Sequence, residues 1–275
     1  MIPYFRLTQI PIGPIHIQVW GLFVSLGVAT ALLCGHREAR RRGLSKSVFL
    51  DMAAWMFLAA VVGARLFYAT VYDPLTFIND PWEVLRLWNG GMSIFGAFFG
   101  AIAAGTIFAR RRKVLFLPYA DVFAFMLPLG CGIGRLGCLL IHDHPGILSR
   151  SFLAINFPDG ARLDHGLLLS LLNFAIFGLF LFLRRHRPGH PTPFLALYAV
   201  MYGSARFGLD FIRAWDLPSA DVRYLWLTPA QYSTLALLLA GVLIFIRKRR
   251  PDPPKLEQAV DGQADVSPEL SQEQG

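Results

Sequence analysis

The sequence predicts an all-α integral membrane protein with about seven transmembrane helices, an external N-terminus and a cytoplasmic C-terminus. Of its 275 residues, 55% are hydrophobic and 23 are Phe, which is more than a soluble domain of this length carries. The apolar residues form runs of about 20, the length that crosses a bilayer. Short basic clusters separate these runs, so the net charge of +8 reflects membrane topology, and no nucleic-acid partner is expected.

The seven runs cover residues 15–35, 48–72, 92–109, 114–141, 166–183, 194–211 and 227–246. Between the first two runs, residues 36–46 hold five Arg and Lys side chains, which favour the cytoplasmic side of a membrane. The N-terminus is therefore expected outside. The second run contains Arg65 near its outer end, where a long basic side chain either reaches the headgroups or contacts a bound substrate.

The third and fourth runs are joined on the inside by the four basic residues at 110–113. The segment before them, 73–91, is expected to be an external loop with Trp82 and Trp88 at headgroup level. The fourth run carries Arg135 and ends outside. A charged side chain within a span is costly and normally faces a polar cavity or a partner, so Arg135 marks a candidate site.

The last four runs are separated by two irregular external loops, 147–165 and 212–226, and by one internal connection. The sixth run carries Arg206 and Asp210 at i and i+4, where a helix brings opposite charges together in either a structural or a functional pair. The four predicted cytoplasmic clusters hold five, four, three and four basic residues, 16 in all, against six in the external segments. This asymmetry supports the predicted orientation.

The membrane domain is expected to cover residues 1–250. Residues 251–275 contain six acidic side chains, a single Lys and few apolar residues, so they are predicted to form a disordered cytoplasmic tail. The three cysteines, Cys34, Cys131 and Cys138, lie in apolar runs without metal-type spacing. Neither a disulfide framework nor a metal site is expected, and no cofactor motif is present.

The end of the fourth run concentrates the residues that carry chemistry. On a helix, Cys131, Arg135, Cys138 and His142 fall at i, i+4, i+7 and i+11 and share one face. The helix is followed by an acid between two histidines, His142-Asp-His144. The glycines at 130, 132, 134 and 137 fit either close helix packing or a backbone opened toward a lipid headgroup, and the sequence leaves both open.

Four motifs carry a family resemblance. They are Gly134-Arg-Leu-Gly137 followed by Asp143 and Gly146, then Arg206-Phe-Gly-Leu-Asp-Phe-Ile-Arg213, Leu227-Thr-Pro-Ala-Gln231 and Gly90-Gly-Met-Ser93. In these motifs, and over nearly all its length, the chain resembles the bacterial prolipoprotein diacylglyceryl transferases. It departs from them where Phe95 replaces a histidine, Cys138 an asparagine and Trp20 a tyrosine, and where Asp143 and Asp210 replace glutamates.

The resemblance implies an inner-membrane enzyme that moves the diacylglyceryl group of phosphatidylglycerol onto the lipobox cysteine of a prolipoprotein signal peptide, the first step of lipoprotein maturation. Its partners are membrane lipid and that peptide. The expected catalytic residues are Arg135, His142, Asp143, His144 and Arg206. The expected substrate-binding residues are Arg135, Gly134, Gly137, Cys138, Gly146, Asp210, Arg213 and Arg65.

These residue types suit the implied chemistry. A planar, permanently charged guanidinium at Arg135 or Arg206 stabilises a phosphate leaving group. A histidine at 142 or 144 is suited to deprotonate the acceptor thiol. Because Phe95 replaces the family histidine, a weakened paralogue that binds lipid or lipopeptide without transfer is the alternative. A transporter is a third hypothesis, disfavoured by an odd number of spans without a visible inverted repeat.

Overall fold

A computed structural model describes residues 1–86, 91–186, 193–217 and 223–246 of the chain. Contacts within the chain divide it into two compact units, each described below by itself. Of the described residues, the first comprises 1–35 and those from 120 onward, and the second comprises His36–Tyr119. The predicted disordered tail lies outside the described residues, and so does the last basic cluster.

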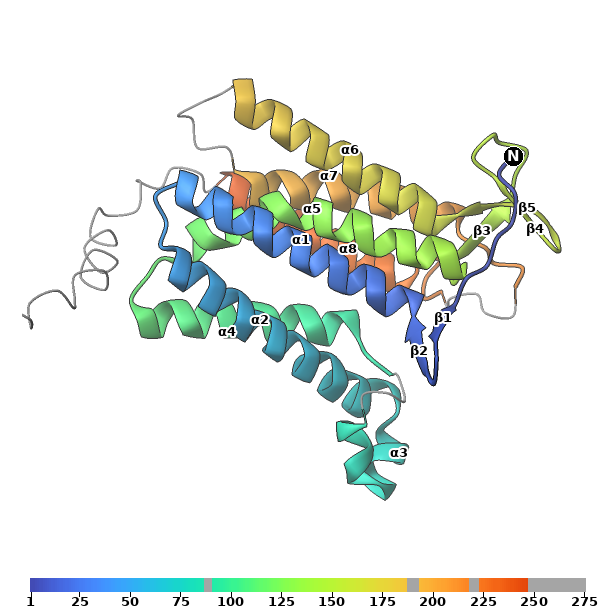
Figure 1. The fold of residues 1–275 in the computed structure, drawn as a ribbon, viewed down its shortest axis with the longest axis horizontal. Helices are drawn as coiled ribbons and strands as arrows, with labels where there is room; N and C mark the ends of the chain where they lie inside the picture. Colours follow the sequence, from blue (N-terminus) through green and yellow to red (C-terminus); the bar gives the residue numbers. More distant parts are fainter. Residues whose placement is uncertain (87–90, 187–192, 218–222, 247–275) are drawn as a thin grey trace, which may run out of the picture. The chain divides into compact units, whose positions relative to one another are not determined.

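The helices of the first unit are α1 (Val19–Arg41), α5 (Phe116–Ile141), α6 (His165–His186), α7 (Phe194–Leu209) and α8 (Pro229–Ile246), and the first residues of α5 and the last of α1 belong to the second unit. Figure 1 shows α7 beside α8, and these two helices make the most extensive contact within the unit. Their sequences are apolar on most sides, as expected for helices that face lipid and one another.

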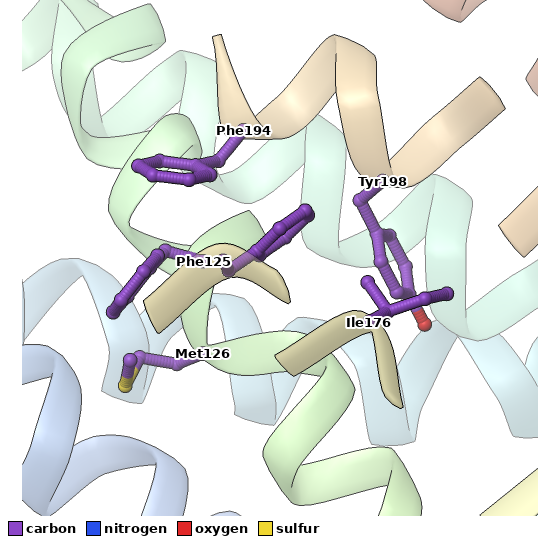
Figure 2. Close-up of a cluster of buried hydrophobic side chains, with 6 residues drawn as sticks. Phe125, Met126, Ile176, Phe194 and Tyr198 are labelled. Atoms are coloured by element: carbon purple, nitrogen blue, oxygen red, sulfur yellow. The ribbon is translucent and has the colours of Figure 1, made fainter. Parts of the chain in front are cut away.

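The core of this unit lies between α5, α6 and α7. Figure 2 shows Phe125 and Met126 of α5 meeting Ile176 of α6 and Phe194 and Tyr198 of α7. The rings of Phe125 and Phe194 are 4.8 Å apart and tilted, a favourable arrangement of aromatic quadrupoles. This packing fixes the three helices that carry the candidate site.

Glycines allow α1 and α5 to approach closely. A Cβ atom on Gly27 would lie 2.5 Å from the carbonyl oxygen of Gly130, and one on Gly137 would lie 2.9 Å from Cβ of Phe23. Helix α5 continues without interruption to Ile141. Of the two roles that the sequence left open for these glycines, the close packing of helices is the one observed.

The second unit contains α2 (Lys46–Phe67), a π-helical turn (Tyr68–Tyr72), α3 (Pro74–Asn79), a 3₁₀ turn (Pro81–Leu85) and α4 (Ile94–Arg112). Helices α2 and α4 lie side by side (Figure 1). They pack through glycine, since a Cβ atom on Gly96 would lie 2.1 Å from the carbonyl oxygen of Gly63. The small-residue pattern of the third run thus serves helix contact, as predicted.

Two small antiparallel sheets correct the all-α prediction. Strands β1 (Gln9–Ile12) and β2 (Ile15–Gln18) form a hairpin at Gly13, whose φ of +60° suits a turn. The first predicted run therefore starts too early: residues 15–18 alternate apolar and polar side chains, the period of a strand, and α1 begins at Val19.

The second sheet occupies the predicted irregular loop 147–165. Its strands β3 (Pro145–Leu148), β4 (Ile155–Phe157) and β5 (Gly160–Asp164) are ordered β3-β5-β4. Gly160, with φ +132°, turns β4 into β5. The loop prediction was wrong because these strands have only three to five residues each, too few to show a clear period.

Five helices among the described residues are long and apolar enough to cross a membrane: α1, α2 with the start of its π-helical turn, α5, α6 and α8. A helical membrane protein is thus confirmed. Helices α4 and α7 match the third and sixth predicted runs but are not in this set; α7 has 16 residues before a 3₁₀ turn, Asp210–Ile212, continues it. The count of seven spans stays a prediction.

Candidate functional site

Arg135 lies in α5 and faces α7. Its guanidinium interacts electrostatically with Tyr202 of α7, with Cys131 and Cys138 of its own helix, and with Asp143 beyond the helix end. The Nη1 atom is 3.8 Å from Sγ of Cys138. Two other predicted site residues, Cys138 and Asp143, therefore lie near this charge.

The charge of Arg135 has no carboxylate partner at ion-pair distance among the residues that the structure describes. Its polar neighbours are two thiols and a phenol, with Asp143 farther away. A guanidinium held among apolar helices without a counter-ion is unfavourable by itself. The arrangement favours the binding of an anion at this point.

Arg206 is fixed by a buried network where α7 ends and α8 begins. Its Nη1 donates to Oδ1 of Asp210 at 2.5 Å, and Asp210 is fully buried. The hydroxyl of Thr228 donates to the other carboxylate oxygen of Asp210. Gln231 then accepts from the backbone N–H of Thr228 at 2.9 Å and donates to the carbonyl of Phe207 at 3.2 Å. The i, i+4 pair predicted from sequence is thus present.

Tyr202 connects the two arginines, because its hydroxyl interacts with both Arg135 and Arg206. One turn earlier on α7, Tyr198 stacks on Tyr202 with ring centroids 5.2 Å apart. The sequence analysis did not single out these tyrosines. Their spacing with Arg206, at i, i+4 and i+8 on an otherwise apolar helix, is the signal that would have found them.

His142 is the first residue beyond α5 and adopts a left-handed backbone conformation, with φ +52°. Helices commonly end on such a residue. Its ring therefore leaves the face of Arg135, contrary to the predicted i+11 register. Nδ1 lies 2.9 Å from Oδ2 of Asp164, and Nε2 lies 3.2 Å from the carbonyl oxygen of Phe5. The ring also stacks on Tyr4, at 4.7 Å between centroids.

These contacts define the chemistry available to His142. A carboxylate and a carbonyl oxygen therefore occupy both ring nitrogens of His142. The side chains of His142 and Asp164 are 5% and 1% exposed. A buried ring with both nitrogens in such contacts holds the end of α5 to the segments of Asp164 and Phe5.

His144 is differently placed. Its Nδ1 lies 2.7 Å from the carbonyl oxygen of Asp143, a contact in which Nδ1 carries the proton, and its Nε2 lies 3.7 Å from Oδ2 of the same residue. Burial lowers the pKa of His144 below its ordinary value; the positive charges of Arg213 and Arg135 act in the same direction, and the Asp143 carboxylate opposes them. The lowered pKa favours the neutral form of His144.

Backbone pairing brings Arg213 to this histidine. Gly146 and Arg213 form an antiparallel bridge, and the N–H of Ala214 donates to the carbonyl of Pro145 at 3.2 Å. A Cβ atom on Gly146 would lie 2.8 Å from the carbonyl oxygen of Leu163, so the close approach requires glycine. As a result, Nη2 of Arg213 lies 3.4 Å from Nδ1 of His144.

Cys138, Gly134 and Gly137 line the α1 side of α5. Cys138 is buried and receives a hydrogen bond from the indole of Trp20 as well as the contact with Arg135. The glycines pack against α1, and Gly137 is the tighter of the two. Trp20 and Cys138, which replace the family tyrosine and asparagine, are therefore direct neighbours. The side chain of Phe95 and residue Gly90 lie outside the described residues.

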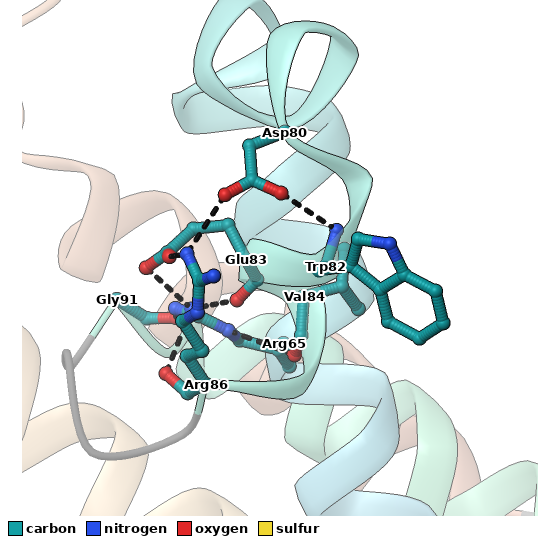
Figure 3. Close-up of polar contacts among 7 residues, drawn as sticks. All are labelled: Arg65, Asp80, Trp82, Glu83, Val84, Arg86 and Gly91. Atoms are coloured by element: carbon teal, nitrogen blue, oxygen red, sulfur yellow. Dashed lines mark hydrogen bonds and ion pairs between the residues drawn. The ribbon is translucent and has the colours of Figure 1, made fainter.

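Arg65 belongs to the second unit, and Figure 3 shows how its donors are used. It donates to the carbonyls of Glu83, Val84, Arg86 and Gly91 at 2.5–3.2 Å and to the Glu83 carboxylate at 3.4 Å. It is 3% exposed and lies over the ring of Phe77 at 5.1 Å. Arg65 thus holds the predicted external loop to α2.

Among the described residues, no group of three or more His, Cys, Asp and Glu side chains is arranged to hold a metal ion.

The comparisons with known proteins place the chain in a family. The family described as prolipoprotein diacylglyceryl transferase matches residues 7–247. The phosphatidylglycerol–prolipoprotein diacylglyceryl transferase of Pseudomonas fluorescens Pf-5 is 32% identical over 91% of this chain and 97% of its own length. The proteins of the same name from Chromohalobacter salexigens and Stenotrophomonas maltophilia are 30% and 29% identical over 88% and 92% of this chain, and over 92% and 96% of their own lengths. The chain belongs to the prolipoprotein diacylglyceryl transferase family.

Proposed function

We propose that this chain transfers the diacylglyceryl group of phosphatidylglycerol to the lipobox cysteine thiol of prolipoprotein signal peptides, in the inner membrane of a bacterium. The names of its relatives supply the two substrates. The observation that carries the proposal is the guanidinium of Arg135, which lies beside Tyr202 and has no carboxylate at ion-pair distance in the described part of the chain. It is the group that a lipid phosphate requires.

Arg135 is proposed to bind the phosphate and to stabilise the leaving group. The guanidinium matches a phosphate with two parallel hydrogen bonds, and negative charge accumulates on the phosphate as the bond to the glyceryl carbon breaks. A donor held in place before that charge develops lowers the barrier without further reorganisation. Arg206, linked to Arg135 through Tyr202 and fixed by Asp210, is the second proposed phosphate contact.

His144 is proposed as the base. Its Nε2 takes the proton of the cysteine thiol, and the thiolate attacks the terminal glyceryl carbon of the lipid. A carbon–sulfur bond forms, the carbon–oxygen bond to the phosphate breaks, and glycerol phosphate leaves with the electron pair. Asp143 and Arg213, on either side of His144, set its protonation.

The other predicted site residues take positioning roles in this proposal. His142 fixes the end of α5 through Asp164, and Gly146 admits the strand that carries Arg213. Gly134 and Gly137 allow α5 to pack closely against α1. Cys138 contacts Arg135 and is not proposed to act as a nucleophile. Arg65, originally predicted to bind substrate, is assigned to the loop of the second unit.

The proposed topology is seven spans with the N-terminus outside and the C-terminus inside. It rests on the 16 basic residues of the predicted cytoplasmic clusters against six in the external segments. The end of α5, with Asp143 and His144, then lies at the outer surface.

The test is transfer by the purified chain in nanodiscs that contain phosphatidylglycerol. A lipobox peptide should gain the mass of the diacylglyceryl group while glycerol phosphate is released in equal amount. A peptide with Ser in place of its Cys is the matched control and should not react. Binding of the peptide without release of glycerol phosphate would instead support the binding-only paralogue.

A further inference from the structure

We infer that Arg162, in the extramembrane sheet, is a positioning residue for the transfer reaction: together with Asp216 it fixes the segment of Arg213 against the strand that follows His144. This inference rests on the proposed function, because it concerns the base of that reaction. Neither residue belongs to the motifs that carry the family resemblance.

Arg162 uses its guanidinium to join three segments. Its Nη1 and Nη2 atoms donate to Oδ1 and Oδ2 of Asp216 at 3.1 and 2.6 Å, a bidentate pair. Its Nε donates to Asp159 at 2.8 Å, and Nη1 also donates to the carbonyl oxygen of Gly146 at 3.1 Å. Arg162 is 3% exposed, so these contacts replace nearly all of its hydration.

We call the contacts of Arg162 with Asp216 and with the Gly146 carbonyl the clamp. Its two ends lie close in sequence to His144 and Arg213. Gly146 is two residues after His144, and Asp216 is three residues after Arg213. The bridge between Gly146 and Arg213 and the hydrogen bond from Ala214 to Pro145 run parallel to the clamp. Arg162 therefore closes a ring of contacts whose other side is the 3.4 Å approach of Arg213 to His144.

The pair is also electrostatically matched. The Arg162 guanidinium lowers the pKa of Asp216, and Asp216 together with Asp159 raises the pKa of Arg162. Both groups therefore remain charged across the pH range of the reaction. The planar guanidinium fork matters, since lysine keeps the charge but cannot reach two carboxylate oxygens and the Gly146 carbonyl at once.

The consequence for His144 is a change of its protonation equilibrium. The charged groups that face His144 are Asp143, Arg213 and Arg135. If the clamp is loosened, Arg213 moves away and one of the two positive charges that favour the neutral ring is lost. Less neutral His144 is then present at a given acidic pH, and the acidic limb of the transfer reaction moves to higher pH.

The variants that test this are Asp216→Asn, at a partly exposed side chain, and Arg162→Lys, which keeps the charge. We expect both to accumulate and to lose roughly tenfold in transfer per folded molecule near pH 6, with an acidic limb shifted upward. Arg150→Lys is the matched control, because this exposed arginine lies in the same extramembrane region and has no assigned role. This variant should show the same acidic limb in the pH dependence of transfer as the wild type.

A second measurement is independent of activity. Titration of ¹³C-labelled histidine in nanodiscs, with His144 assigned from the spectrum of His144→Gln, should give a higher pKa for His144 in Asp216→Asn than in the wild type. An unchanged His144 titration and an unchanged acidic limb would overturn the inference while wild-type transfer continued. Absence of transfer by the wild type would instead refute the proposed function and leave the titration to decide the inference.

Discussion

Nδ1 of His142 lies 2.9 Å from Oδ2 of Asp164, 22 residues further along the chain. Asp164 also accepts the backbone N–H of Leu167 at 3.0 Å and so caps the first turn of α6. The contact ties the end of α5 to the start of α6. It removes His142 from competition for the role of base and leaves the next histidine, His144, beside Arg213.

This separation predicts opposite effects for the two histidines. His142→Gln should lower the thermal stability of the protein by disturbing a buried hydrogen bond to Asp164, a loss of about 1–3 kcal/mol, while molecules that fold keep most of their transfer activity. His144→Gln should accumulate normally and lose on the order of 100-fold or more in transfer. Thermal unfolding and transfer per folded molecule check both, and the reverse pattern would reassign the base to His142.

Arg135→Lys should reduce transfer about 100- to 1000-fold while the protein still accumulates in the membrane, because lysine keeps the charge but loses the paired hydrogen bonds to phosphate. The measurement is transfer per folded molecule with phosphatidylglycerol and a lipobox peptide. A specific activity close to that of the wild type would remove Arg135 from the site.

The pH dependence follows from His144. Burial lowers its pKa below the ordinary 6.5, so the neutral, proton-accepting form persists at neutral pH and is lost only as the pH falls through that lowered value. Transfer should therefore fall on an acidic limb below pH 6.5. Asp143→Asn removes the charge that opposes this lowering, so its limb should lie at still lower pH. A limb that moves upward in Asp143→Asn would contradict the assignment.

Cys138→Ser should keep substantial activity. Cys138 contacts Arg135 and Trp20 and is buried, and the proposed reaction transfers the lipid directly to the peptide. Mass spectrometry of the wild type during turnover should find no lipid on Cys138. A trapped adduct there, together with complete loss of activity in Cys138→Ser, would establish a covalent intermediate instead.

The proposed topology is checked by reporter fusions. Fusions after Lys113, Arg187 and Arg250 should report a cytoplasmic location, and fusions within 73–91 and 147–165 should report an external one. A cytoplasmic location for the segment of His142 and His144 would place the end of α5 on the wrong side for the proposed site.

The sequence by itself determined the membrane class, most helix positions and the central charge. Long apolar runs and basic clusters reflect the cost of placing polar groups in lipid. This cost depends on the local sequence, so both can be recognised without knowledge of the tertiary structure. Arg135 could be recognised as a candidate site residue for the same reason. The pair of Arg206 and Asp210 could also be recognised, because the two residues lie one helical turn apart.

Only the tertiary structure decided which groups each histidine contacts, what Arg65 holds and which residues surround Arg135. Asp164 and Phe5 engage His142 from segments 22 and 137 residues away, and Tyr202 reaches Arg135 from another helix. Such contacts depend on how helices and strands pack, and no local period in the sequence records them. The short strands β3, β4 and β5 were not predicted for a related reason. Pairing with a partner strand, rather than their own composition, makes them strands.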